Sequence, residues 1–286
     1  MHEAGWHDKL TTLPLCMLAM IIDTLISSRW IIPVVPPGLT LDYHSLAIHN
    51  GKILELLPTD QALRKYQPTR VADLDHHALI PGLINSHTHS PMTFLRGIAD
   101  DLPLMEWLKG TIWPLEQKWV GEAFVREGAE LAIAEMLRGG VTCFNDMYFF
   151  PEIVARAALQ SGIRACVGLI VIDFPSAWAQ DSDEYLEKGL ALYDELRNES
   201  LLTPVFAPHA PYSVSDDALK KIRIYAEELQ APIHMHIHET RDEIEQGLEC
   251  SGMRPLARLK KLDLLGPSLI AVHMTQLLDE EIDWIA

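Results

Sequence analysis

Two histidines one residue apart follow an apolar segment early in the chain. His87 and His89 follow the run 79–85, which is apolar enough to form a buried β-strand. Side chains at positions i and i+2 of a strand point to the same side, so both imidazoles can reach one point. Two converging imidazole nitrogens are a ready pair of metal ligands, although such a pair alone is more often a packed or surface feature.

A second cluster, in the segment 233–240, combines three alternating histidines with a carboxylate. His234, His236 and His238 share one face of an expected strand, and Glu239 follows the last of them. Aliphatic residues fill the other face, which is typical of a buried parallel strand and not of an exposed polar one. We interpret one of these histidines as a third metal ligand and Glu239 as a proton-transfer group.

Single histidines stand at the ends of two further expected strands. His209 follows the run 204–207, and His273 ends the run 269–273. One histidine at such a place is more often a hydrogen-bonded structural residue. Four strands that all carry histidine at the same end are different, because active sites of (β/α)₈ barrels are built at the carboxyl ends of the strands.

The elements that must position these residues alternate between strands and helices from residue 78 onward. Apolar strands are expected at 79–85, 141–145, 165–172, 204–207, 233–237 and 269–273. Helices are expected at 122–138 before Gly139, at 151–160 before Gly162, and at 215–230 with Ser215 as the N-cap. This alternation predicts an α/β fold of βα units on a parallel sheet.

The region before residue 78 is organised differently. Residues 23–77 read as short strands of a partial small β domain, with a hairpin turn at Asn50-Gly51. Residues 1–22 are expected to be an N-terminal extension. Its apolar run 13–22 is too short to span a bilayer and lacks the small-residue cleavage pattern of an export signal.

Charge and cysteine content exclude several classes of protein. The chain of 286 residues has 23 Lys and Arg against 40 Asp and Glu, a net charge of −17, which disfavours nucleic acid and anionic membrane as partners. Cys16, Cys143, Cys166 and Cys250 are widely spaced, so neither a disulfide framework nor a thiolate zinc site is indicated. We expect a cytoplasmic protein.

The combined motifs resemble those of the amidohydrolase superfamily, from about residue 23 to residue 286. Within it they resemble the deaminases of 5′-methylthioadenosine and S-adenosylhomocysteine, which are themselves similar to triazine chlorohydrolases. The resemblance implies a (β/α)₈ TIM-type barrel over 78–286 with a small β-sandwich domain, one divalent metal ion, zinc above all, a purine nucleoside substrate and a homo-oligomer. The motifs are Leu79-Ile-Pro-Gly-Leu-Ile-Asn-Ser-His-Thr-His, Phe94-Leu-Arg-Gly, Met105-Glu-Trp-Leu, Trp113-Pro-Leu-Glu116 and His236-Ile-His-Glu239-Thr240.

The resemblance also implies a role for each site residue. His87 and His89 are the first two metal ligands and His236 is the third, since the H-x-x-E spacing then matches Glu239 to the family's acid/base carboxylate. His273 matches the histidine that holds the attacking water. Three residues match positions that contact the base, line the pocket and bind the ribose hydroxyls: His209, Trp107 and Glu116.

This set of residues fits hydrolytic deamination. Zinc with three protein ligands and an open position lowers the pKa of bound water from 15.7 to about 7. Metal-bound hydroxide can attack C6 of an adenine, while Glu239 protonates N1 and assists loss of ammonia. A triazine-type or guanine-type hydrolase is the alternative, but Glu116 argues against it because a substrate without a sugar has no hydroxyls to bind. Metal identity and the 5′ substituent stay open.

The length leaves one more alternative. Residues 79–286 accommodate about six βα units, whereas a closed barrel needs eight. The segment after His273 reads as a helix that begins at Asp279, so Asp279 and Asp283 are expected to be solvated, and no residue matches the metal-binding Asp of the family's eighth strand. We therefore expect a C-terminally truncated chain, with an inactive fragment as the non-enzyme alternative.

Overall fold

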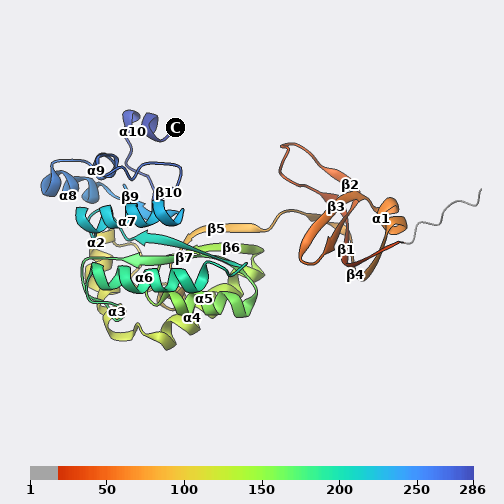
Figure 1. Cartoon of the computed structure of the whole chain (residues 1–286), viewed down its shortest axis with the longest axis horizontal. Helices are drawn as coiled ribbons and strands as arrows, with labels where there is room; N and C mark the ends of the chain where they lie inside the picture. Colours follow the sequence, from red (N-terminus) through yellow and green to blue (C-terminus); the bar gives the residue numbers. More distant parts are fainter. Residues whose placement is uncertain (1–18) are drawn as a thin grey trace, which may run out of the picture. The chain divides into compact units, whose positions relative to one another are not determined.

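The computed structural model describes residues 19–286, which form two compact units that divide between Pro81 and Gly82 (Figure 1). Most of the expected N-terminal extension lies outside the described residues. The extension was expected to reach residue 22, but the first strand, β1 (Met20–Ile31), already begins at Met20.

The first unit is a four-stranded sheet with one short helix. Its strands lie in the order β3-β2-β1-β4, and β4 runs parallel to β1 while the other neighbours are antiparallel. The expected hairpin turn is present, and Asn50 and Gly51 both take positive φ, of 51° and 70°, as a type I′ turn requires. The elements after β1 are β2 (Leu41–His49), β3 (Lys52–Pro58), α1 (Thr59–Lys65) and β4 (Tyr66–Leu79).

The boundary between β4 and the next strand corrects one prediction. The run 79–85 was expected to be a single strand, but Leu79 ends β4 and β5 begins at Leu83. Pro81 lies between them, and proline has no N–H to give to a sheet ladder. Strand β5 also ends later than expected, at Thr88, so His87 lies within the strand and His89 lies just beyond it.

The second unit is a six-stranded parallel sheet in the order β10-β9-β8-β7-β6-β5, with helices between the strands (Figure 1). Each strand pairs with the next strand along the chain, which is the arrangement of consecutive βα units in a TIM-type barrel. The predicted α/β barrel class, with six βα units, is confirmed. The strands are β5 (Leu83–Thr88), β6 (Val141–Asp146), β7 (Arg164–Val171), β8 (Leu202–Pro208), β9 (Ile233–Ile237) and β10 (Leu269–His273).

The helices of this unit begin and end largely where their capping residues predict. The helix expected at 122–138 has those bounds, Gly162 ends α5 in the left-handed region with φ of 69°, and the Ser215 side chain accepts from the Ala218 N–H. The last helix begins at Asp279, as expected. The helical segments are η1 (Ser90–Leu95), α2 (Leu104–Trp107), η2 (Leu108–Ile112), α3 (Trp113–Trp119), α4 (Glu122–Arg138), α5 (Pro151–Ser161), α6 (Ser182–Leu196), α7 (Asp216–Leu229), α8 (Arg241–Ser251), α9 (Pro255–Lys261) and α10 (Asp279–Ile285).

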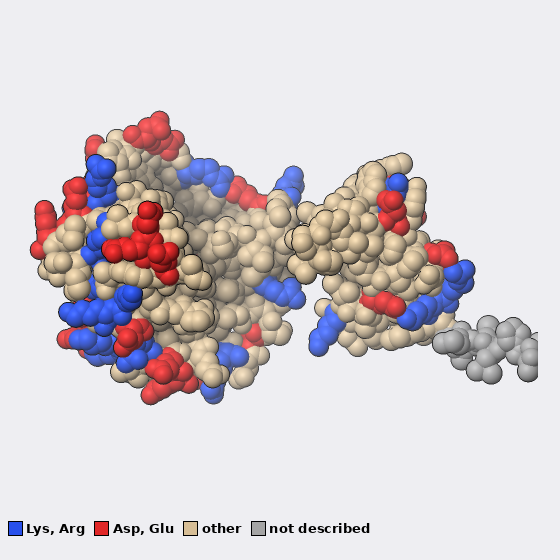
Figure 2. All heavy atoms as spheres, turned by 90° about the horizontal axis from the view of Figure 1, so that it is seen from above, with Lys and Arg blue, Asp and Glu red and all other residues tan. Residues whose placement is uncertain are grey.

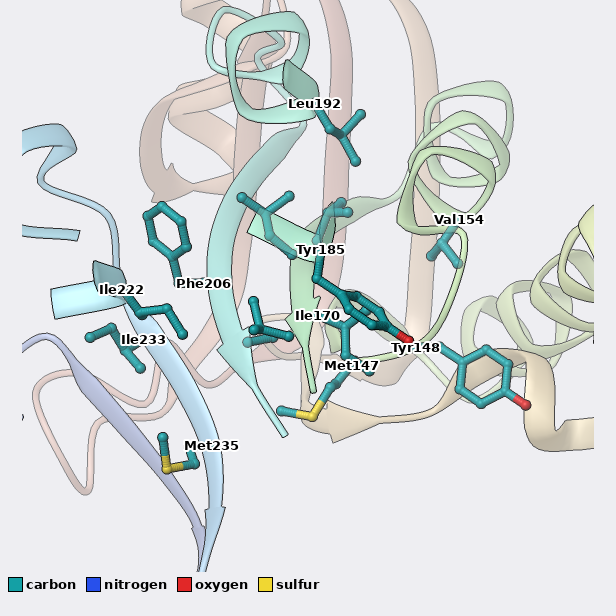
Figure 3. Packing of buried hydrophobic residues seen from close by; sticks show 14 of the residues in the cluster. Met147, Tyr148, Val154, Ile170, Tyr185, Leu192, Phe206, Ile222, Ile233 and Met235 are labelled. Atoms are coloured by element: carbon teal, nitrogen blue, oxygen red, sulfur yellow. The ribbon is translucent and has the colours of Figure 1, made fainter. Parts of the chain in front are cut away.

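The hydrophobic core of the second unit lies between the sheet and these helices. Phe206 of β8, Ile222 of α7 and Ile233 of β9 gather at one side of it (Figure 3). Close packing also restricts residue size, because a Cβ at Gly168 of β7 would lie 2.4 Å from the Asp146 carbonyl oxygen. Strands β6 and β7 are therefore in tight contact, and residues of the site follow their carboxyl ends.

Charged side chains of both signs are interspersed on the face seen in Figure 2, with no large area of one sign. Within residues 19–286, no helix is both long enough and apolar enough to cross a membrane.

Candidate metal centre

The carboxyl ends of the barrel strands surround a cavity of about 970 Å³. Every site residue expected from the sequence lines it, although these residues come from six segments of the chain. Strands and their ends supply the histidines and Glu239, and the helices after β5 supply the rest. The residues are His87, His89, Trp107, Glu116, His209, His236, Glu239 and His273.

Three imidazoles meet at one point of the cavity. The Nε2 atom of His236 lies 3.2 Å from Nε2 of His87 and 3.3 Å from Nε2 of His89. Zinc binds histidine nitrogen at about 2.0–2.1 Å, so two ligands of a tetrahedral site stand about 3.3 Å apart. Nε2 of His236 therefore stands from each of the other two nitrogen atoms at the spacing of two ligands of one metal ion, and the donor set fits zinc.

Backbone carbonyls fix the tautomers of two of these rings. Nδ1 of His89 donates to the Met147 carbonyl, and Nδ1 of His236 donates to the His209 carbonyl at 2.7 Å. A carbonyl can only accept, so the proton of each neutral ring is on Nδ1 and the lone pair of Nε2 faces the centre. His87 differs, since its Nδ1 lies 3.0 Å from Nε2 of the buried His234.

The cavity keeps its histidines neutral. Burial, reinforced by the neighbouring histidines, lowers the pKa of His87 to about 3 and that of His236 well below its ordinary value. Burial likewise lowers the pKa of His89, and it lowers that of His209 to about 3. Neutral imidazole is the form that binds a metal, so these rings need not lose a proton at neutral pH.

A carboxylate and a fourth histidine face each other beside this centre. Oε1 of Glu239 lies 3.4 Å from Nε2 of His273. Burial raises the pKa of Glu239, which favours a carboxyl able to hold a proton, and burial lowers the pKa of His273. Nitrogen atoms of His87, His236 and His273 also lie within 4.8 Å of one another, so the geometry offers a second three-histidine set.

Another part of the cavity wall combines a carboxylate with aromatic rings. Glu116 accepts a hydrogen bond of 2.7 Å from the Tyr148 hydroxyl, and burial raises the pKa of Glu116. Tyr148 belongs to the buried cluster, and in Figure 3 its hydroxyl points away from the other labelled side chains. Trp113 and Phe174 lie with ring centroids 6.2 Å apart and also line the cavity. This wall can bind a flat ring system and can accept hydrogen bonds from hydroxyl groups.

Three groups of the site were not predicted from the sequence. The Met147 and His209 carbonyls hold metal-facing rings, but a backbone carbonyl has no residue signature. Tyr148 could have been found, because it stands two residues beyond the end of β6, in the same kind of strand-end position that drew attention to His209.

Two bacterial proteins that share one name are similar in sequence to most of this chain. It is 48% identical over 260 residues to the 5-methylthioadenosine/S-adenosylhomocysteine deaminase of Saccharophagus degradans, which is 91% of this chain and 58% of that protein. The protein of the same name from Teredinibacter turnerae is 49% identical over 265 residues, 93% of this chain and 60% of the relative. The chain thus spans about three fifths of the length of these relatives.

Solved structures give the same picture of the fold. An adenosine deaminase from Xanthomonas campestris, solved with bound zinc, has a TM-score of 0.92 and 47% identity over 93% of this chain and 61% of its own. Atrazine chlorohydrolase from Arthrobacter aurescens, at 20% identity and a TM-score of 0.83 over 92% of this chain and 63% of its own, shares the fold. Residues 78–286 match the amidohydrolase family, so the chain belongs to that family.

Proposed function

We propose that this chain holds one zinc ion through His87, His89 and His236 and hydrolyses the 6-amino group of an adenosine derivative. The substrate class comprises adenosine, 5′-methylthioadenosine and S-adenosylhomocysteine. The main support is the spacing of 3.2 Å and 3.3 Å between Nε2 of His236 and the other two rings. The names of the relatives, including the zinc-bound structure, support the same activity.

Among the two histidine sets, we assign the metal to the one that contains His89. His236 belongs to both sets. Nδ1 of His89 is anchored by the Met147 carbonyl, as is usual for metal-binding histidine. His273 faces Glu239 instead. Because His273 is not one of the assigned ligands, it can orient the attacking water beside the metal.

We assign the proton transfers to Glu239 and the orientation of the water to His273. A bound zinc ion supplies Lewis-acid activation, which lowers the pKa of water from 15.7 to about 7. Hydrolysis would join a water oxygen to C6 of the purine, break the C6–N6 bond and release ammonia. Glu239 takes the two protons of the water in turn, giving one to N1 and the other to the departing amino group. Its raised pKa suits both steps.

The remaining pocket residues are assigned to substrate binding. We propose that Glu116 accepts hydrogen bonds from the ribose hydroxyls, with Tyr148 fixing its carboxylate at 2.7 Å. Trp107 forms part of the wall, and His209 stands next to the base. We assign the whole activity to residues 78–286, as the hydrolase barrel, and none of it to the β domain at 23–77.

The test uses the 286-residue chain, loaded with zinc and dialysed. Zinc content is measured by mass spectrometry, and ammonia release is measured with adenosine, 5′-methylthioadenosine and S-adenosylhomocysteine. We expect about one zinc per chain and turnover of at least one nucleoside. Glu239→Gln is expected to keep the zinc and to lower turnover about 10²- to 10⁴-fold.

Other outcomes would contradict the proposal in distinct ways. Activity on guanine or a chlorotriazine, without activity on any nucleoside, would favour the other hydrolases of the family. Stoichiometric zinc with no turnover of any substrate would show that the chain alone is not an active enzyme. Full zinc retention in a His236→Ala variant would overturn the assigned ligand set.

A further inference from the structure

We propose that Glu243 is a positioning residue, which holds the Glu239 side chain at the reacting atoms by binding the backbone of the turn between β9 and α8. The inference rests on the proposed role of Glu239 in proton transfer. Glu243 itself is not among the described residues that line the cavity.

One carboxylate binds two consecutive peptide groups of this turn. Oε1 of Glu243 accepts from the His238 N–H at 3.0 Å, and Oε2 accepts from the Glu239 N–H at 2.7 Å. Hydrogen bonds from an amide to a charged carboxylate are roughly twice as strong as neutral ones. Because both oxygens are used, the peptide plane that precedes Glu239 cannot rotate without losing at least one bond.

The turn needs such support because its backbone is strained. His238 has a φ of 55°, in the left-handed region, which is strained for a non-glycine residue and persists only where the surroundings enforce it. On the other side of the turn, Thr275 donates from its N–H to the His238 carbonyl at 3.0 Å and from its hydroxyl to the Glu239 carbonyl at 2.7 Å. The amides and the carbonyls of the turn are thus held from opposite sides.

This arrangement goes beyond ordinary helix capping. In a capping box the residue at the third helical position binds the N–H of the N-cap residue. Thr240 is the N-cap of α8 and accepts from the Glu243 N–H at 3.3 Å, yet the Glu243 carboxylate passes Thr240 and binds the two residues before it. The bonds therefore order the segment that carries Glu239, whereas a cap alone would order only the helix end.

Helix α6 provides an internal comparison. Glu184 holds the equivalent position after the N-cap Asp181, and its carboxylate accepts from the single N–H of Gln180 at 2.8 Å. It also pairs with Lys188 at 2.7 Å and is about one third exposed. Glu184 therefore has the same helical position and the same kind of bond, but its helix carries none of the proposed site residues.

The Glu243 carboxylate is also buried, and it forms no salt bridge with any cationic side chain of residues 19–286. It is 5% exposed, and among the described residues the groups that perturb its pKa are backbone N–H groups and Glu239. Burial raises the pKa of Glu243, while the N–H bonds lower it. Burying a carboxyl group that water would otherwise solvate is costly, so two strong backbone bonds are the compensation that this site offers.

The test compares Glu243→Gln with the matched control Glu184→Gln in the full, zinc-loaded chain. Glutamine keeps the shape but turns an amide NH₂ group toward one of the two N–H donors. A displacement of about 1 Å at a catalytic group can reduce turnover on the order of 10²-fold. We expect Glu243→Gln to lower kcat about 10- to 100-fold with KM and zinc content unchanged, and Glu184→Gln to change none of the three.

A second readout does not depend on activity. Hydrogen exchange of the peptide that spans residues 237–241 should become faster in Glu243→Gln and stay unchanged in Glu184→Gln. If the wild-type chain has no deaminase activity, the proposed function fails, but exchange still tests the hold on the turn. Unchanged exchange, or faster exchange together with wild-type kcat, would refute the positioning role.

The conservative variant covers the case in which Glu243→Gln does not fold. Glu243→Asp keeps the charge but is one methylene shorter, so it can reach only one of the two N–H groups. We expect an intermediate loss, about 10-fold in kcat, again with KM unchanged. Wild-type kcat in this variant, together with faster exchange at the turn, would overturn the proposal.

Discussion

Asp146, at the end of β6, should make the stability of the barrel unit depend on pH. Its side chain is 2% exposed and accepts from the Ser90 N–H at 2.6 Å. Burial, partly offset by the hydrogen bond from the Ser90 N–H, raises the pKa of Asp146 from 3.8 to about 7. The folded state then holds this proton more tightly than the unfolded state, so stability falls as pH rises from about 4 to about 7 and is level above that.

The size of the effect follows from the shift. A change of about 3 pKa units at 1.36 kcal/mol per unit amounts to about 4 kcal/mol in full, of which about 2 kcal/mol falls between pH 5 and pH 7. The asparagine side chain in Asp146→Asn does not titrate, so its stability does not fall with pH in this way. We therefore expect Asp146→Asn to gain about 2 kcal/mol relative to wild type when the pH rises from 5 to 7.

Urea unfolding of both proteins at the two pH values measures this gain. A chelator keeps the protein free of metal, and comparing the two differences cancels any fixed cost of the amide. Asp217→Asn, at a side chain that is 88% exposed, serves as the control and should show no such gain. A difference between wild type and Asp146→Asn that is the same at pH 5 and pH 7 would refute the reasoning.

Three further substitutions test the packing and the pocket. Gly168→Ala places a Cβ 2.4 Å from the Asp146 carbonyl oxygen and should lower the free energy of unfolding by about 1–3 kcal/mol. The melting temperature should fall accordingly, and an unchanged melting temperature would show that the two strands can move apart at little cost. Phe206→Ala removes a side chain with 0% exposure and should cost about 3–5 kcal/mol in urea unfolding, and a cost below 1 kcal/mol would contradict the packing described. Glu116→Gln should raise KM for adenosine about 10-fold through weaker hydroxyl binding, and an unchanged KM would remove Glu116 from ribose recognition.

Much of the fold could be predicted from the sequence, because βα units leave periodic signals. The strands 233–237 and 269–273 and the helix 122–138 have the expected bounds, since apolar runs end at clear capping or turn residues. Residues 23–77 were expected to form short strands, whereas β4 has 14 residues, although its sequence is largely polar and contains Pro68. It pairs with β1 in the observed sheet, and that long-range pairing decides its structure.

The histidines of the site could be predicted from the sequence, but the groups that hold them in place could not. Histidines at strand ends converge because parallel strands bring their carboxyl ends together, so His87, His89 and His236 could be expected to meet. What holds those rings could not be expected, since the Met147 carbonyl is a backbone group. The reach of Glu243 past its own N-cap depends on the left-handed turn at His238, which short-range pattern does not reveal.

The metal centre also has a consequence for how the chain is tied together. His89 and His236 are 147 residues apart in sequence, and their Nδ1 anchors lie at the ends of two other strands, β6 and β8. A metal ion bound at this point would act as a cross-link that closes a very long loop, and such closure removes more freedom from the unfolded chain than from the folded one. Loss of the ion would then loosen four strands together, so metal occupancy would report the tertiary order of the barrel as well as its readiness for catalysis.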